Sequence, residues 1–242
     1  MKTFLKKFIP FGIDAMVWQH TDNKLEPRAV RDTLLGREPF GHAPSEANIV
    51  VGKSDTVIGQ NVVFQCTLGT LYQLLFGGNA SYLKNIIAKQ NNFDISDISG
   101  FRAKRRDYTY TKRLDNSIWP RQPKCLTTET LEDDDTNSYI HVKQIYKTPG
   151  APSGNSFHVH TSFYPSWGGN NTTRMSVVTN VVWAGKSLLK GAVERGSIGG
   201  QTGTTEILIG EVNKILSSTR ATNKKTWKKG AGGCSERYIH LL

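Results

Sequence analysis

The chain has 242 residues, a length that fits one folded domain with terminal extensions better than two domains. Its formal net charge of +11 predicts an anionic partner, which could be nucleic acid, an acidic protein or an anionic membrane surface. No apolar run approaches the roughly 20 residues of a membrane-spanning helix. We therefore expect a soluble chain with a basic surface.

The N-terminal part of the chain gives few structural signals. Residues 1–47 mix basic, apolar and helix-breaking side chains without a sustained period, which predicts a linker or sequence added in cloning. Strand-like apolar clusters follow at Ile49–Val51 and Val62–Phe64. Two short helices are then predicted over residues 67–76 and 81–90, separated by a glycine turn.

The middle of the chain changes to a period of two, which is typical of strands with one buried face. Strands are expected at Asp107–Lys112, Lys124–Leu131, Tyr139–Tyr146, Ser156–Tyr164 and Thr173–Trp183. The segments between them are polar or contain glycine and proline, so an antiparallel meander is favoured. A meander has one face to bury, and the next segment supplies a helix to cover it.

Residues 183–216 have apolar side chains at helical spacing in both halves, with Ser187 as a candidate N-cap. Glycines between the halves allow two interpretations. One continuous helix would place Gly196 and Gly200 on its apolar face and leave space beside it, although each glycine costs roughly 0.5 to 1 kcal/mol. Two shorter helices joined by a turn at Gly199–Gly200 would leave no such space.

The domain expected over residues 48–217 is therefore α+β, with an early strand, two short helices, an antiparallel sheet and a closing helix. A sheet that curves around one long helix encloses an apolar space where a ligand would bind. Residues 218–242, in which four lysines surround Trp227, predict a basic flexible tail.

Several segments match the motifs of a known family, in the family's order. They are Leu75–Gly77, Asn92–Ile95, Tyr108–Tyr110, Ser117–Lys124, Thr148–Phe157 and Trp183–Glu194. These motifs resemble those of the StART-like (VASt) domains of the Lam/Aster sterol transporters, and the resemblance covers roughly residues 48–216. It implies a helix-grip fold that takes one sterol, such as ergosterol or cholesterol, from a membrane into an internal cavity and delivers it to another membrane.

The resemblance also implies a cellular setting. Full-length relatives act on the cytosolic face of the endoplasmic reticulum at membrane contact sites and carry a PH-like GRAM domain and a membrane anchor. Neither is recognisable here, so we expect an excised transfer module that acts as a monomer. No catalytic activity and no cofactor are expected.

Sterol-binding residues are predicted on a lid-like loop and on the closing helix. They are Ser117, Ile118, Trp119 and Pro120 on the loop, and Leu189, Ala192, Val193, Gly196, Gly200 and Ile207 on the helix. An exposed Trp119 would suit the polar–apolar boundary of a membrane, whereas the alternative is a side chain folded into the core. The family often has glycine before the loop proline, so Trp119 departs from its pattern. The partner of the sterol hydroxyl is left open.

Basic residues in the middle of the chain are predicted to dock on an anionic leaflet. They are Arg105, Arg106, Lys112, Arg113, Arg121 and Lys124. Each basic side chain near such a surface contributes on the order of 1 kcal/mol, while the alternative is a solvated charged face. A nucleic-acid-binding module is the competing function, and its affinity would fall steeply with salt.

The sequence offers no strong metal or catalytic site. His158 and His160 share a strand face, but no third ligand lies nearby in sequence. The acidic run 132–135 lacks the spacing of an EF-hand loop. The three cysteines are far apart, which predicts reduced thiols in a cytosolic compartment. No nucleophile or acid–base arrangement emerges, so an enzyme is the least favoured class.

Overall fold

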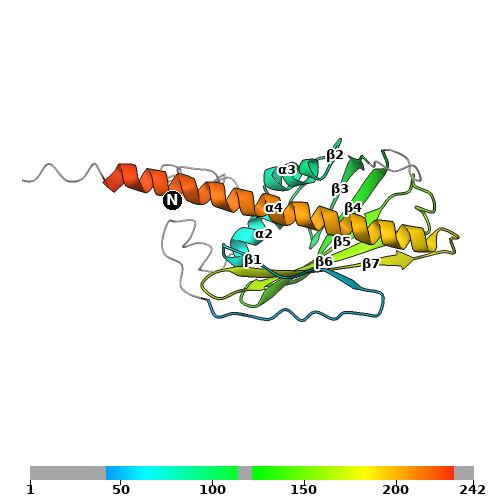
Figure 1. Ribbon diagram of the computed structural model, residues 1–242, viewed down its shortest axis with the longest axis horizontal. Coiled ribbons are helices and arrows are strands. Elements are labelled where there is room, and N and C mark those ends of the chain that lie inside the picture. The colour runs from blue at the N-terminus through cyan, green and yellow to red at the C-terminus, as the bar shows by residue number, and fades with distance from the viewer. Residues whose placement is uncertain (1–41, 114–121, 232–242) are drawn as a thin grey trace, which may run out of the picture.

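The computed structural model describes residues 42–113 and 122–231, with side chains as far as Ser218. These residues form a curved antiparallel sheet, two short helices and one long helix (Figure 1). The elements are β1 (Thr56–Phe64), α2 (Leu68–Phe76), α3 (Ser81–Lys89), β2 (Asn92–Phe93), β3 (Arg105–Lys112), β4 (Lys124–Asp135), β5 (Tyr139–Lys147), β6 (Phe157–Trp167), β7 (Thr173–Trp183) and α4 (Lys190–Ala231).

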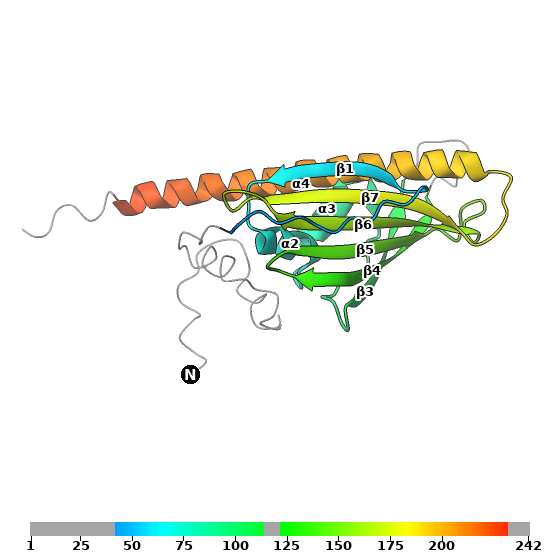
Figure 2. The same ribbon diagram turned by 90° about the horizontal axis from the view of Figure 1, so that it is seen from below.

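The seven strands have the order β1-β7-β6-β5-β4-β3-β2, so the strands after β1 form a meander and β1 closes the edge beside β7. The concave side of the sheet carries all three helices, and α4 crosses it close to β1 and β7 (Figures 1 and 2). The predicted α+β helix-grip architecture is confirmed. The five strands expected in the middle of the chain correspond to β3 through β7.

The long helix α4 is continuous through its glycines, so the first of the two interpretations is correct. It begins at Lys190, later than a Ser187 cap would imply, although the Ser187 hydroxyl oxygen accepts a hydrogen bond from the Leu189 amide at 3.0 Å. Its backbone continues as a helix to Ala231, into the range 218–242 for which a basic flexible tail was predicted. No proline interrupts this stretch, and the helical hydrogen bonding simply carries on.

The N-terminal described residues are bound to the convex face of the sheet, where they cross β6 and β7 (Figure 2). The Ser45 amide donates to the Trp167 carbonyl at 3.0 Å, and the His42 ring stacks on the Trp167 ring at 4.3 Å. Arg174 donates to the carbonyl of Ser45 and to the carboxylate of Glu46. The folded part therefore includes residues 42–47, which were expected to be linker.

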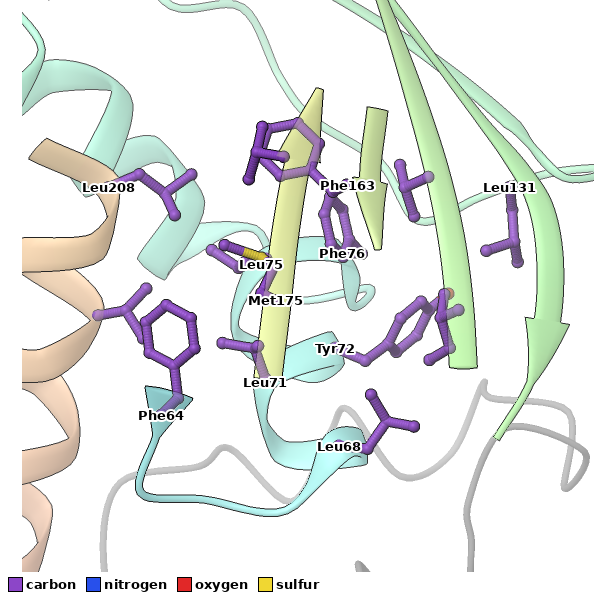
Figure 3. Packing of buried hydrophobic residues seen from close by; sticks show 14 of the residues in the cluster. Phe64, Leu68, Leu71, Tyr72, Leu75, Phe76, Leu131, Phe163, Met175 and Leu208 are labelled. Atoms are coloured by element: carbon purple, nitrogen blue, oxygen red, sulfur yellow. The ribbon is translucent and has the colours of Figure 1, made fainter. Parts of the chain in front are cut away.

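The apolar interior consists of three separate clusters. The largest lies between α2, the sheet and the middle of α4, and it includes Phe64, Leu71, Phe163, Met175 and Leu208 (Figure 3). A second joins α3 to β3 and β4, and a third lies near the start of α4. Single domains usually have one contiguous core. Smaller satellite clusters beside such a core are also usual, and here they lie next to α3 and next to the start of α4.

Candidate functional site

Five polar side chains cross the middle of the concave face in a single line. Strand register places Arg106 opposite Glu129, Glu129 opposite Gln144, Gln144 opposite Thr161, and Thr161 opposite Thr179. Directly opposed residues project from the same face of a sheet. All five are buried. We call Arg106, Glu129, Gln144, Thr161 and Thr179 the polar row.

The charges in the polar row are paired inside the protein. One Glu129 oxygen accepts from Arg106 Nε at 2.6 Å, and the other accepts from Tyr108 at 2.8 Å and from Gln144 Nε2 at 2.6 Å. The Gln144 oxygen in turn accepts from the Tyr146 hydroxyl. A buried charge without such partners would cost several kcal/mol, so this network fixes the positions of its members.

Both tyrosines of this network keep their protons at neutral pH. Burial, and then the negative charge of Glu129, raises the pKa of Tyr108 and the pKa of Tyr146 well above the usual value. Each phenol therefore keeps donating within the network, Tyr108 to Glu129 and Tyr146 to Gln144. At the far end of the row, the hydroxyls of Thr161 and Thr179 lie 3.0 Å apart.

Beyond the polar row, toward the end of the sheet where α4 begins, the concave face becomes largely apolar. Tyr146, Val159 and Val181 follow in one line across the strands, and Phe157 and Trp183 lie opposite each other beyond them. From Thr179 to Trp183 this surface extends about 13 Å at about 3.3 Å per residue. We call Tyr146, Phe157, Val159, Val181 and Trp183 the apolar floor. Tyr146, Val181 and Trp183 are only partly buried.

Helix α4 lies over the floor and then over the polar row. Val193 is 1% exposed and packs against Phe157 and Val159, and the Trp183 indole donates to Glu194 at 3.0 Å. The same face of α4 continues one turn at a time through Ser197, Gln201 and Thr205 to Leu208. The inner face of α4 between Val193 and Leu208 is therefore polar.

Of the predicted helical wall residues, Val193 is buried against the sheet. The exposed ones are Leu189, Ala192, Gly196, Gly200 and Ile207. A Cβ added to Gly196 or Gly200 would meet nothing within 4 Å, so these glycines do not allow close packing on the sheet. The prediction used apolar and small residues to mark the inner face, but that face carries serine, glutamine and threonine. Ser117, Ile118, Trp119 and Pro120 lie outside the described residues.

The predicted docking residues do not form one surface. Arg106 is corrected: its side chain is fully buried, and besides Glu129 it bonds the carbonyls at the end of α2. The charge run hid this because neighbouring strand residues face opposite sides. Arg105 is exposed and paired with Asp107 at 2.9 Å, and it lies at the opposite end of β3 from Lys112.

The remaining basic candidates flank the connection between β3 and β4. Arg113 and Lys124 are exposed, whereas Lys112 is partly buried with its Nζ 3.5 Å from the Thr204 hydroxyl. Burial lowers the pKa of Lys112. Arg121 lies outside the described residues. The exposed charges of this group thus lie at the end of the sheet where α4 begins.

The histidine and cysteine side chains can be placed in the part of the chain that the structure describes. There, no three His, Cys, Asp or Glu side chains are grouped to hold an ion. The rings of His158 and His160 lie 5.1 Å apart on the convex face, where burial lowers the pKa of His160 to about 4. Cys125 is a free thiol, and burial raises its pKa to about 11. None of the described helices combines the length and apolar character needed to cross a bilayer.

Comparison with known families agrees with this architecture. The sequence model of the VASt family, the VAD1 Analog of StAR-related lipid transfer domain, matches residues 58–200, which is more than half of the chain. The chain belongs to the VASt family. The matched range runs from β1 through the floor and the polar row into the first turns of α4.

Two fungal relatives match this VASt domain. It is 27% identical over 163 residues to the membrane-anchored lipid-binding protein LAM5 of Saccharomyces cerevisiae, a match that covers 64% of this chain and 24% of LAM5. It is 26% identical over 170 residues to the uncharacterized membrane protein C20F10.07 of Schizosaccharomyces pombe, covering 69% and 22% respectively. The chain thus spans about a quarter of the length of the curated relatives it matches.

Solved structures show more distant likeness to the VASt domain. TTHA0849 from Thermus thermophilus aligns with a TM-score of 0.45 at 10% identity, covering 68% of this chain and 98% of that one. Norcoclaurine synthase from Thalictrum flavum aligns with a TM-score of 0.43 at 11% identity, covering 72% and 98%. At these scores the likeness supports no functional conclusion.

The sequence reasoning missed the polar row of this VASt domain. A usable signal was present, because Glu129, Gln144 and Thr161 fall in phase with apolar residues of the predicted buried strand faces. A polar residue in that phase means either that the strand is wrongly assigned or that a polar side chain lies inside the protein. Aligning the phases of neighbouring strands would have placed the three side by side.

Proposed function

We propose that this VASt domain binds one sterol between the apolar floor and α4 and carries it between membranes without chemical change. The observation that carries the proposal is the buried polar row at the inner end of an otherwise apolar surface. A sterol is a rigid apolar body with one hydroxyl, so it matches a long apolar surface that ends in a few hydrogen-bonding groups. Family membership supports the same ligand class.

In this proposal the hydroxyl enters first and reaches Gln144 and Tyr146. Gln144 uses one amide hydrogen for Glu129 and its oxygen for Tyr146, which leaves its second amide hydrogen as a donor. The Tyr146 oxygen remains an acceptor. The ring system then lies along Val159 and Val181 toward Trp183, and apolar burial at about 25 cal/mol per Å² retains it.

Transfer requires exchange with a bilayer, and the exposed side chains of Arg113 and Lys124 support docking on anionic lipid. Arg121, which lies outside the described residues, is proposed to take part. The name of the yeast relative describes a membrane-anchored protein, which supports a setting in which a longer parent protein holds the domain at a membrane. We place that action on the cytosolic face of the endoplasmic reticulum at contact sites. The ligand is ergosterol or cholesterol.

Two neighbouring valines of β7 test the binding site. Val181 belongs to the floor and Val182 faces the other side of the sheet, so Val181→Trp fills the site while Val182→Trp is a matched control. We expect a fluorescent sterol to bind the unaltered chain and the Val182 variant saturably at one site, and to bind the Val181 variant at least tenfold more weakly. Circular dichroism of both variants checks folding.

Two results would overturn the proposal. One is equal sterol affinity for the two tryptophan variants, which would move the ligand away from the floor. The other is an unaltered chain that binds no sterol but binds oligonucleotides with a steep salt dependence, which would favour the nucleic-acid alternative.

A further inference from the structure

The turn between β7 and α4, residues 184–189, exposes two consecutive leucines. Leu188 is 105% exposed, the highest value among the large apolar side chains of the described residues, and Leu189 is 41% exposed. Single exposed apolar residues are common on protein surfaces, so exposure alone has no meaning. Three further features distinguish this turn, which we call the β7–α4 turn.

First, the protein holds the β7–α4 turn in place. The hydroxyl oxygen of Ser187 accepts from the Leu189 amide at 3.0 Å and lies 2.9 Å from the hydroxyl of Ser153 in the neighbouring β5–β6 connection. The Ala184 amide donates to the Ser156 carbonyl at 2.8 Å. The leucines therefore project from an anchored turn.

Second, lysines flank the leucines. Lys186 and Lys190 are both exposed, and Lys190 Nζ lies 6.0 Å from the centre of the Trp183 ring. A carboxylate is close by, but Glu194 already accepts the indole hydrogen bond of Trp183 and lies 3.9 Å from Lys190 Nζ. A leucine pair between two lysines has the composition of a segment that enters the outer part of a bilayer, because lysine stems extend to the headgroups.

Third, the charge of the domain is divided along the strands. The other connections at this end of the sheet are flanked by Arg113, Lys124 and Lys147, all of them exposed. The opposite end is mixed in charge: the acidic run 132–135 lies next to the β4–β5 turn, Lys104 pairs with Asp134 at 3.3 Å, and Arg105 pairs with Asp107. An anionic surface would therefore attract the domain with the β7–α4 turn toward it.

We propose that the β7–α4 turn inserts Leu188 into an anionic bilayer while Lys186 and Lys190 contact the lipid phosphates. This inference rests on the proposed membrane transfer and adds the element that fixes how the domain sits on the membrane. A protruding side chain needs a preformed pocket on a protein partner, whereas a fluid bilayer yields to it. Insertion here also brings the Trp183 end of the apolar floor near the lipid, since Trp183 directly precedes the turn.

Flotation with vesicles of phosphatidylcholine and phosphatidylserine tests the insertion. Leu188→Asp should weaken vesicle binding about tenfold, because apolar contact is lost and a negative charge is added. Leu188→Trp should bind at least as well as the unaltered chain, since tryptophan suits the interface. Val50→Asp is the matched control: Val50 is 76% exposed but belongs to the segment on the convex face, so its variant should bind normally.

Lysine variants test the charge contribution separately. Lys186→Glu combined with Lys190→Glu should remove much of the preference for vesicles that contain phosphatidylserine and should flatten the salt dependence. Binding to pure phosphatidylcholine vesicles should change little.

Measurements of sterol binding without vesicles keep this inference apart from the proposed function. Leu188→Asp should bind a fluorescent sterol normally in solution. If the unaltered chain binds no sterol but Leu188 still governs vesicle binding, the transfer proposal fails and the inserted turn stands. Equal vesicle binding by the Leu188→Asp and Val50→Asp variants overturns the inference. So does a change in sedimentation without a change in vesicle binding, which would assign the leucines to a protein contact.

Discussion

The concave face has two halves, one on each side of the polar row, and they are built differently from the same strands. On the side of α2, Phe163, Met175 and Val177 are at most 3% exposed because helix side chains fill the space above them. On the other side, Val181 and Trp183 continue the same strand but are only partly buried. The first half supplies stability, and the second half retains surface that a ligand can cover.

Among the variants considered, loss of the buried Arg106 charge in the polar row should reduce stability the most. Arg106→Met would leave Glu129 buried without its ion pair and the carbonyls at the end of α2 without their donor. We expect the free energy of unfolding to fall by about 3 to 5 kcal/mol, as measured by urea denaturation. Arg105→Met, next to it on the exposed face, is the control and should cost less than about 1 kcal/mol.

A double variant sharpens that result. Arg106→Met combined with Glu129→Leu removes both buried charges, so it should recover part of the loss if the penalty comes from an unpaired carboxylate. A double variant as unstable as the single one would instead assign the effect to the end of α2.

Truncating one apolar side chain to alanine in each half should give the next largest difference in the free energy of unfolding. Leu71→Ala removes a fully buried side chain from the packed half, which should cost about 2 to 5 kcal/mol of unfolding free energy. Val181→Ala in the other half should cost less than about 1.5 kcal/mol, because that side chain is only partly buried. Chemical denaturation measures both.

The Leu71→Ala and Val181→Ala variants should also differ in their affinity for sterol. Val181→Ala should weaken fluorescent-sterol binding, whereas Leu71→Ala should leave the affinity of the folded fraction unchanged. If both variants lose equal stability and neither changes sterol affinity, the two halves are equivalent and the ligand lies elsewhere.

Much of the fold could be predicted, because in most elements the spacing of apolar residues in the sequence matches the face that the element buries. The alternation across Thr173–Trp183 predicts the strand found as β7, and the apolar spacing in residues 67–76 predicts α2. Sequence reasoning could also order the strands as a meander, since their connections are short. It could not choose between one helix and two across Gly199–Gly200, because the outcome depends on tertiary contacts that Val193 makes before the glycines and Leu208 makes after them.

The site was less predictable from sequence. Its polar side chains occupy inward-facing positions, whereas the pattern that predicts the fold assumes that inward-facing residues are apolar. Ser197 and Gln201 occupy the inner face of α4, and an apolarity rule therefore selected Ile207 and the glycines beside them. Arg106 and Glu129 look like solvated charges in sequence, since only the register between β3 and β4 shows that each has its partner inside the sheet.

The smallest expected effect concerns the outside of the molecule, where the two ends of the sheet differ in charge. Lys124 is exposed at the end that carries the β7–α4 turn, whereas Arg105 is exposed at the other end beside Asp107. Lys124→Ala should weaken binding to vesicles containing phosphatidylserine about fivefold, which corresponds to about 1 kcal/mol. Arg105→Ala should leave it unchanged, because that end faces away from the bilayer. Equal losses would mean that the basic residues act through net charge alone and that the domain has no preferred orientation on the membrane.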